Sequence, residues 1–139
     1  MPATFTFPVR VYYEDTDAAG VVYYANYLRY LERARTEWLA AAGHSVAELQ
    51  RVQRIVFVVR RIEVDFRAAA RLADRLDVTV ALESLGRASL AVVQHVLRGG
   101  EPIVTARVLL ACVDTQAMKP VRIPIDLASL RATGVESPS

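Results

Sequence analysis

The longest helical pattern in the chain covers residues 24–42, where apolar side chains recur at intervals of three and four. Its expected buried face consists of Tyr24, Tyr27, Leu28, Leu31, Arg35, Trp38, Leu39 and Ala42. Arg35 is the one polar member of that face. Gly43 follows at the position where glycine commonly ends a helix. Because a helix buries its apolar face against another element, the pattern predicts a long helix lying on a sheet.

Elsewhere apolar positions alternate with polar ones, which is the period of a strand. Strands are predicted over residues 4–13, 55–66, 76–85, 88–97 and 103–114. Gly86 and the pair Gly99 and Gly100 lie at tight turns, so the later strands are expected to be antiparallel neighbours. The last strand is apolar on both faces, which predicts an inner position in the sheet. Short helices are predicted over residues 45–52 and 125–131.

One strand, one long helix and four antiparallel strands in this order predict an α+β fold. Residues 1–139 are expected to form a single domain, with a core over residues 4–124 and a C-terminal tail over residues 125–139. One helix covers only one face of a sheet. The other face therefore predicts a partner chain, and hence a homo-oligomer.

The composition is that of a globular protein, with 53% hydrophobic and 23% charged residues. The first ten residues contain no apolar core of a signal peptide, and no apolar run has the length of a membrane span, so no integral membrane segment is expected. The single cysteine, Cys112, lies in an apolar strand and is interpreted as a small buried side chain. These features predict a reducing, cytoplasmic location.

Of the 17 basic side chains, all but Lys119 are arginine. With 15 acidic side chains, the net charge is +2. Arginine binds phosphate in a two-pronged geometry, so a phosphate-bearing ligand is one interpretation, and a genomic preference for arginine codons is the other. No basic stripe interleaved with aromatic residues is present, and nucleic acid is not an expected partner.

Residues 12–27 carry the strongest chemical signal, with three carboxylates, one glycine and five of the six tyrosines just before and within the predicted helix start. Asp17 is ionised at neutral pH, and the positive end of a helix would keep it so. It could attack a carbonyl carbon or activate a water, and backbone N–H groups at the helix start could stabilise an oxyanion. The alternative is that Asp17 only caps a turn. Glu14 and Asp15 are expected to be solvated or to pair at an interface.

Several blocks carry a resemblance that covers residues 8–124. They are Asp15-Thr16-Asp17-Ala18-Ala19-Gly20-Val21-Val22, then Tyr27, Tyr30, Glu32 and Arg33-Ala34-Arg35, and later Phe57-Val58-Val59-Arg60, Ala70-Arg71-Leu72 with Asp74, and Met118-Lys119-Pro120. With these blocks the chain resembles the hotdog-fold acyl-CoA thioesterases of the 4-hydroxybenzoyl-CoA thioesterase type. Within them it is most similar to the bacterial group associated with the Tol-Pal envelope system.

The resemblance implies an antiparallel sheet wrapped around one long central helix, dimers that pair into tetramers, and an active site at the dimer interface. It implies that Asp17, three residues before Gly20, is the catalytic aspartate. It also implies that the backbone amide of Tyr24 polarises the thioester carbonyl. Some members of the group carry histidine at the position of Tyr24, so here the resemblance supports a mechanism with the aspartate alone.

The substrate is expected to be an acyl-CoA, with acyl carrier protein as a further possible partner. The residues expected to bind substrate are Tyr23, Asn26, Phe57 and Val59 near the acyl group and Arg60, Arg61 and Arg87 near the CoA phosphates. Asn26 has the alternative role of a helix cap. The three arginines have the alternative of being solvated surface residues. The spacing of His44, His95 and Cys112 is not that of metal ligands, and neither a metal nor another cofactor is expected.

Two other functions compete with hydrolysis. The first is a weakly catalytic module that binds acyl-CoA or acyl carrier protein in envelope lipid metabolism. The second is a hydratase of enoyl thioesters, which is disfavoured because no His/Asp pair of suitable spacing is present. Ser45 follows a helix, whereas a nucleophilic serine of the elbow type follows a strand, so Ser45 is interpreted as a helix cap.

Overall fold

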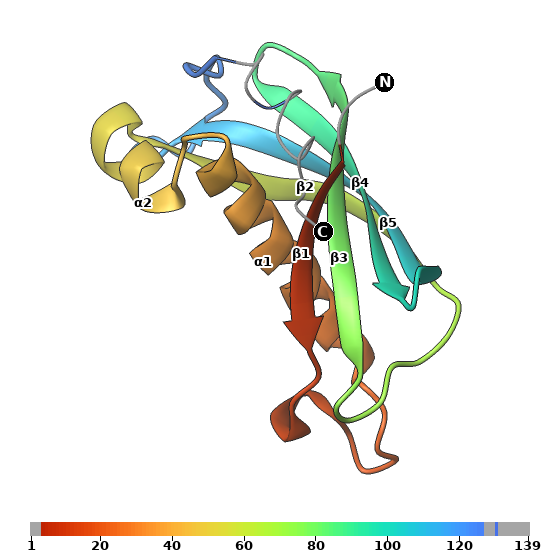
Figure 1. Ribbon diagram of the computed structural model, residues 1–139. Helices are drawn as coiled ribbons and strands as arrows, with labels where there is room; N and C mark the ends of the chain where they lie inside the picture. Colours follow the sequence, from red (N-terminus) through yellow and green to blue (C-terminus); the bar gives the residue numbers. More distant parts are fainter. Residues whose placement is uncertain (1–3, 127–129, 131–139) are drawn as a thin grey trace.

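The computed structural model describes residues 4–126 and residue 130, and Figure 1 shows its arrangement. Its elements in chain order are β1 (Thr4–Arg10), the 3-10 turn η1 (Tyr13–Asp15), α1 (Tyr24–Ala41), α2 (Val46–Glu48), the π-helical turn η2 (Leu49–Gln53), β2 (Ile55–Phe66), β3 (Arg75–Leu85), β4 (Ser89–Arg98) and β5 (Glu101–Asp114). The central helix and all five strands occur where the sequence predicts them. The helix predicted over residues 125–131 falls mostly outside the described residues.

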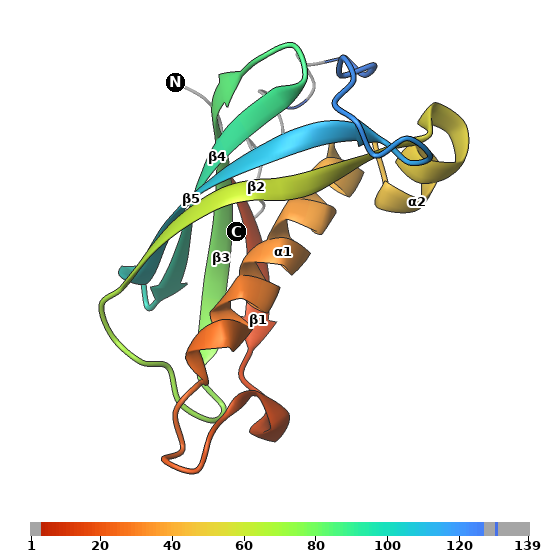
Figure 2. The same cartoon turned by 180° about the vertical axis from the view of Figure 1, so that it is seen from behind.

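The five strands form one antiparallel sheet in the order β1-β3-β4-β5-β2. The sheet curves around α1, which lies in its hollow (Figures 1 and 2). β5 lies between β4 and β2, so its predicted inner position is confirmed. β1 and β2 are the edge strands. The observed architecture is thus the predicted antiparallel sheet wrapped around one long central helix.

The first strand is shorter than predicted, because it ends at Arg10 and not at residue 13. The N–H of Tyr12 donates a hydrogen bond of 2.9 Å to Oδ2 of Asp15, and this side chain turns the backbone away from the sheet. Short acidic side chains commonly compete in this way with a strand's own hydrogen bonds. The consequence is a tight turn just before the segment that carries Asp17.

The buried face of α1 differs in part from the predicted one. Tyr30 and Ala34 are fully buried, whereas Tyr24 and Leu28 are 62% and 39% exposed. The buried stripe is therefore rotated from the predicted line toward Tyr30. Farther along the helix, Arg35, Trp38 and Leu39 are buried as predicted, where α2 and η2 pack near that end of α1.

Cys112 is fully buried in β5, as predicted, and burial raises the pKa of its thiol to about 11. Among the described residues, no helix is long and apolar enough to cross a membrane. Nor does that part of the chain bring together three or more side chains that could hold a metal ion.

Candidate active site

Asp17 lies in an exposed turn between η1 and α1. Its Oδ1 accepts a hydrogen bond of 2.9 Å from the N–H of Ala19, and its own N–H donates to the carbonyl oxygen of Val21 at 2.9 Å. The N–H of Gly20 donates to the Asp17 carbonyl oxygen at 3.0 Å. Gly20 has a φ of +80°, which favours glycine, and closes the turn. The turn therefore presents the carboxylate of Asp17 to solvent in one orientation.

Asp15 connects this turn to the start of α1. Its carbonyl oxygen accepts two hydrogen bonds, at 3.1 Å from the N–H of Tyr23 and at 2.9 Å from Nδ2 of Asn26. Asp15 is only 8% exposed, so the expectation that it is solvated is wrong. The capping role considered for Asn26 is also wrong, because Tyr23 occupies the cap position and Asn26 bonds back to Asp15.

The first turn of α1 has an N–H group available for a ligand. Tyr23, the residue before the helix, provides no side-chain cap, and no acidic side chain lies in the first turn. Within the described chain, the N–H of Tyr24 has no acceptor. Free N–H groups at a helix start carry partial positive charge and bind developing anions. The Tyr24 amide therefore has the chemistry that an oxyanion hole requires.

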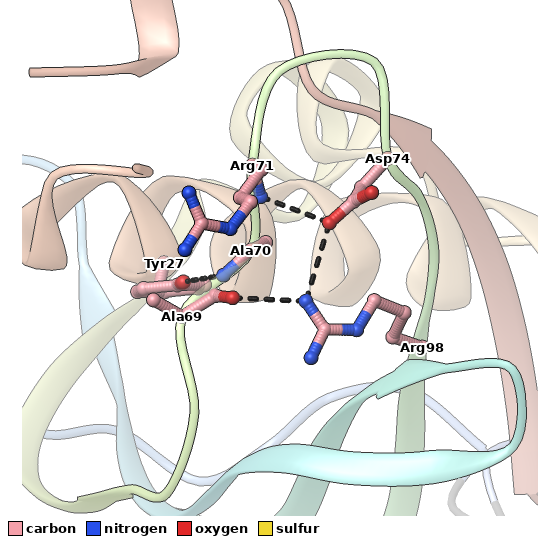
Figure 3. A network of polar contacts seen from close by, with 6 residues as sticks. All are labelled: Tyr27, Ala69, Ala70, Arg71, Asp74 and Arg98. Atoms are coloured by element: carbon pink, nitrogen blue, oxygen red, sulfur yellow. Dashed lines mark hydrogen bonds and ion pairs between the residues drawn. The ribbon is translucent and has the colours of Figure 1, made fainter. Parts of the chain in front are cut away.

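The loop between β2 and β3 supports this segment from the other side (Figure 3). The Ala70 N–H donates a hydrogen bond of 2.9 Å to the hydroxyl of Tyr27 on α1. The Ala70 carbonyl oxygen in turn accepts a hydrogen bond of 2.9 Å from the N–H of Val22, just before α1. One residue, Ala70, thus joins the helix to the end of the turn that carries Asp17.

Arg98, at the end of β4, holds the same loop in place (Figure 3). Its Nη1 donates to the carbonyl oxygen of Ala69 at 2.9 Å and to Oδ2 of Asp74 at 3.2 Å. The same Asp74 oxygen accepts from the Arg71 N–H at 2.9 Å. Sequence reasoning missed Arg98, and the one local signal is its place directly before the turn formed by Gly99 and Gly100.

Aromatic rings cover the start of α1 and the end of β2. The rings of Tyr23 and Tyr24 lie 4.8 Å apart, and the ring of Phe66 lies 6.3 Å from Tyr24 and 5.8 Å from Tyr27. Tyr23 and Tyr24 are nevertheless 47% and 62% exposed. The end of β2 therefore lies beside the start of α1, next to a partly exposed aromatic surface.

Two of the four predicted acyl-binding residues, Tyr23 and Asn26, lie at the start of α1, and the other two lie elsewhere. Phe57 and Val59 line a cavity of about 440 Å³ whose other walls come from the C-terminal half of α1, from α2 and η2, and from Leu110 of β5. This cavity is at the opposite end of α1 from the Asp17 turn, as Figure 2 shows for α2 and the loop before α1. A single chain therefore does not bring Asp17 and these two residues together.

The three predicted arginines are also dispersed. Arg60 and Arg61 lie exposed on the edge strand β2, where the pairing with β5 shifts register between Val59 and Arg61. Arg61 lines a separate hollow with Arg107. Arg87 is exposed in the turn between β3 and β4, and its carbonyl oxygen accepts from the Ile123 N–H at 2.8 Å.

The site combines a free N–H at the start of α1 with an exposed carboxylate on a turn that is bonded to that helix start, and the sheet curves around the helix. The sequence matches the family model of the Thioesterase-like superfamily over residues 11–130. The chain therefore belongs to that superfamily.

Individual relatives agree with this assignment. The chain is 44% identical over 120 residues to the acyl-CoA thioesterase YbgC of Haemophilus influenzae, which covers 86% of this chain and 88% of that protein. The crystal structure of a probable thioesterase from Bartonella henselae has a TM-score of 0.85 at 36% identity, over 88% of this chain and 100% of that one. A 4-hydroxybenzoyl CoA thioesterase, solved with 4-hydroxybenzoyl CoA, has a TM-score of 0.84 over 93% of this chain and 99% of that one, and at 21% identity it shares the fold. The predicted family and the hotdog fold are confirmed.

Proposed function

We propose that this protein is an acyl-CoA thioesterase, which hydrolyses an acyl-CoA to a free carboxylic acid and CoA. One observation carries the proposal: the turn that carries the exposed carboxylate of Asp17 is joined by the Asp15 carbonyl oxygen to the start of α1, where the Tyr24 N–H has no acceptor among the described residues. The similarity to the acyl-CoA thioesterase YbgC supports the same substrate class.

In the proposed reaction the Tyr24 N–H binds the thioester oxygen as negative charge develops on it. Removal of one such donor typically costs about 3 kcal/mol of transition-state stabilisation. Asp17 either attacks the carbonyl carbon, to give a mixed anhydride that water then hydrolyses, or takes a proton from the attacking water. Both routes release the CoA thiol and one carboxylic acid. Both need Asp17 ionised, and no other side chain has to titrate.

The separation of Asp17 from the cavity leads to a proposed dimer. β2 is an edge strand, with one side free to pair. Its end lies beside Tyr24 and Tyr27, and its beginning lines the cavity with Phe57. Antiparallel pairing of β2 with β2 of a second copy sets the beginning of one strand against the end of the other. The cavity of one chain would then meet the Asp17 turn of its partner, as the family resemblance implies.

The dimer has a direct test. Val59 is 46% exposed on β2, and a Val59→Asp substitution would place a charge in the proposed strand pair. We expect the mass measured by light scattering to fall to that of one chain, whereas the control Leu72→Asp, at a position 51% exposed on the β2–β3 loop, keeps the larger mass. A single-chain mass for the unchanged protein would contradict the dimer.

The CoA phosphates would lie against arginines. Arg60 and Arg61 on the free edge strand and Arg87 in the β3–β4 turn remain the candidates, because arginine binds phosphate in a two-pronged geometry. A cytoplasmic location, pairing of dimers into tetramers, an acyl carrier protein partner and the association with the Tol-Pal system stay predictions.

The second candidate is a weakly catalytic binding module for acyl-CoA or acyl carrier protein. Tyr24, at a position where some members of the group carry histidine, favours this candidate. Release of free thiol from a panel of short, long and aromatic acyl-CoA thioesters decides between the two. We expect turnover that falls at least 100-fold in Asp17→Asn, which keeps the shape and removes the charge. Near-normal turnover of that variant would contradict the proposed mechanism, and binding without turnover in the unchanged protein would favour the module.

A further inference from the structure

Arg35 is a buried cation on the wall of the cavity beside Phe57. Its side chain projects from the C-terminal half of α1, the residue is 8% exposed, and it lines the cavity of about 440 Å³. Its Nη1 donates a hydrogen bond of 3.0 Å to Oε1 of Gln94. Nε2 of Gln94 in turn donates a hydrogen bond of 3.1 Å to the carbonyl oxygen of Leu31. Gln94 is fully buried in β4. The guanidinium is therefore held in one position by a neutral partner.

No carboxylate forms an ion pair with Arg35 in the part of the chain that the structure describes. The ion pairs there are Arg67–Asp65, Arg98–Asp74 and Arg107–Glu83. Burial lowers the pKa of Arg35, and the charge of Glu32, one turn earlier on α1, opposes that change. A buried charge is costly unless an opposite charge and hydrogen bonds compensate it. Arg35 thus has one neutral hydrogen bond where a guanidinium offers five donors.

The remaining donors of Arg35 reach open space. Among the described side chains, the Tyr30 hydroxyl is the only fully buried polar atom without a hydrogen-bond partner. The unpaired guanidinium nitrogens are therefore not sealed in the core, and the open space that the side chain lines is the cavity. A ligand that enters the cavity can accept hydrogen bonds from them.

The other walls suit a methylene chain. Leu39, Leu49, Ile55, Phe57 and Leu110 contribute apolar surface. Glu32 also lines the cavity, but it is exposed, so water screens its charge, whereas the buried charge of Arg35 acts through a medium of lower dielectric constant. Thr36 and Gln50 add two neutral polar side chains to the wall, so the arrangement is a largely apolar cavity with one effective cation.

We propose that the cavity takes an acyl chain that ends in a carboxylate, so that the substrate is the CoA monothioester of a short dicarboxylic acid. Arg35 binds the distal carboxylate, and the apolar walls bind the methylenes between the two ends. An arginine–carboxylate contact in a two-pronged geometry is among the stronger hydrogen-bonded pairs in proteins. This inference names the substrate class of the proposed thioesterase, and it rests on that activity and on the proposed dimer, which sets the cavity of one chain against the Asp17 turn of its partner.

The test compares three pairs of CoA thioesters with equal carbon counts: succinyl with butyryl, glutaryl with valeryl, and adipyl with hexanoyl. Within a pair a carboxylate replaces a methyl group, so the ratio of kcat/KM isolates the distal charge. We expect the dicarboxylic member to be favoured at least tenfold in at least one pair. In Arg35→Met, which keeps an unbranched apolar stem and removes the guanidinium, we expect that ratio to fall at least tenfold through KM while the neutral thioesters are still hydrolysed.

If Arg35→Met does not fold, Glu32→Gln is the substitute test, because Glu32 is exposed and its replacement leaves the core intact. Removal of this carboxylate lowers the repulsion of an anion in the cavity, and we expect the ratio to rise about threefold. The control Glu37→Gln, exposed on the same helix and absent from the cavity wall, leaves the ratio unchanged.

Two outcomes would overturn the inference in distinguishable ways. Equal or better turnover of the neutral member in all three pairs overturns the assignment of the substrate class and leaves the thioesterase function standing. Folded protein that hydrolyses none of the six thioesters overturns the proposed function, and this inference with it.

Discussion

The side-chain amide of Asn26 donates a hydrogen bond of 2.9 Å to the main-chain oxygen of Asp15. This bond joins the first turn of α1 to the segment that carries Asp17 two residues later. The Tyr23 N–H donates to the same oxygen. The position of the proposed catalytic carboxylate relative to the helix N-terminus is thereby set by contacts that need not touch the substrate.

This geometry predicts that Asn26 acts on the rate and not on binding. Asn26→Ala removes a buried hydrogen bond, which costs about 1 kcal/mol of stability and lets the Asp17 turn move relative to α1. We expect kcat to fall at least tenfold and KM to change less than about twofold, as measured by thiol release. A rise in KM at constant kcat would instead show that Asn26 contacts the substrate, which is the binding role predicted for it from the sequence.

Gly20 is predicted to matter for activity beyond its contribution to stability. At a φ of +80° an alanine side chain is strained, although no atom lies within 4 Å of the added Cβ. Gly20→Ala should cost about 1 kcal/mol and displace the Asp17 turn. Gly43→Ala, at a φ of +93° after α1, should cost a similar amount and leave kcat unchanged. Equal effects of the two variants on kcat would show that the Gly20 turn does not position the reaction.

Arg98 is predicted to support the site through the β2–β3 loop. Arg98→Ala removes the donor to the Ala69 oxygen, which belongs to the same peptide unit as the N–H that bonds to Tyr27, so we expect a severalfold loss of kcat. Arg67 provides the control, since its pair with Asp65 is exposed on both sides and contributes little. Thermal unfolding and thiol release measured on both variants separate the two roles. Identical kinetics of Arg98→Ala and the unchanged protein would contradict the supporting role of Arg98.

Tyr30 is predicted to be replaceable by phenylalanine with a gain in stability. Its hydroxyl is buried without a hydrogen-bond partner in the described structure, and burial, followed by the nearby Asp15, raises its pKa. Removal of an unpaired polar group from the core should raise the free energy of unfolding by about 1 kcal/mol. Denaturant titration of Tyr30→Phe measures the change. A loss of stability would show that the hydroxyl donates to Asp15 in solution.

Cys112 is predicted to make the stability depend on alkaline pH. Burial raises the pKa of its thiol from 9.0 to about 11, so the folded state holds the proton more tightly than the unfolded state does. This contribution is fully present below pH 9 and is lost as the pH rises toward 11. Denaturant titrations across that range should show a steeper loss of stability for the unchanged protein than for Cys112→Ala. Equal slopes would contradict the prediction, as would a rapid reaction of the native thiol with a thiol reagent at neutral pH.

Local sequence patterns predict the elements well because hydrophobic periodicity and turn chemistry act over a few residues. The predicted helix begins at Tyr24, where α1 begins, and β2 matches its predicted range of residues 55–66. The alternation cannot show how far a strand continues once a side chain bonds to the backbone, and β1 therefore ends three residues early, where Asp15 accepts from Tyr12.

Long-range contacts were not predictable in the same way. Tyr27 and Ala70 are 43 positions apart in the sequence, and Arg98 is 29 from Ala69, so no local period relates them. The burial of Asp15 depends equally on where the helix start lies against the turn. The roles of these residues follow from the packing of the loop against α1.

The sequence by itself determined the helix, the strands, the hairpins at Gly86 and at Gly99 and Gly100, and the turn in which Gly20 follows Asp17, because each depends on neighbouring residues. Only the tertiary structure decided that the Asp17 turn and the cavity beside Phe57 lie at opposite ends of α1, and that the unpaired charge of Arg35 lines that cavity. These properties arise from the curvature of one sheet around one helix. The curvature depends on all five strands together, so no single segment of the sequence determines it.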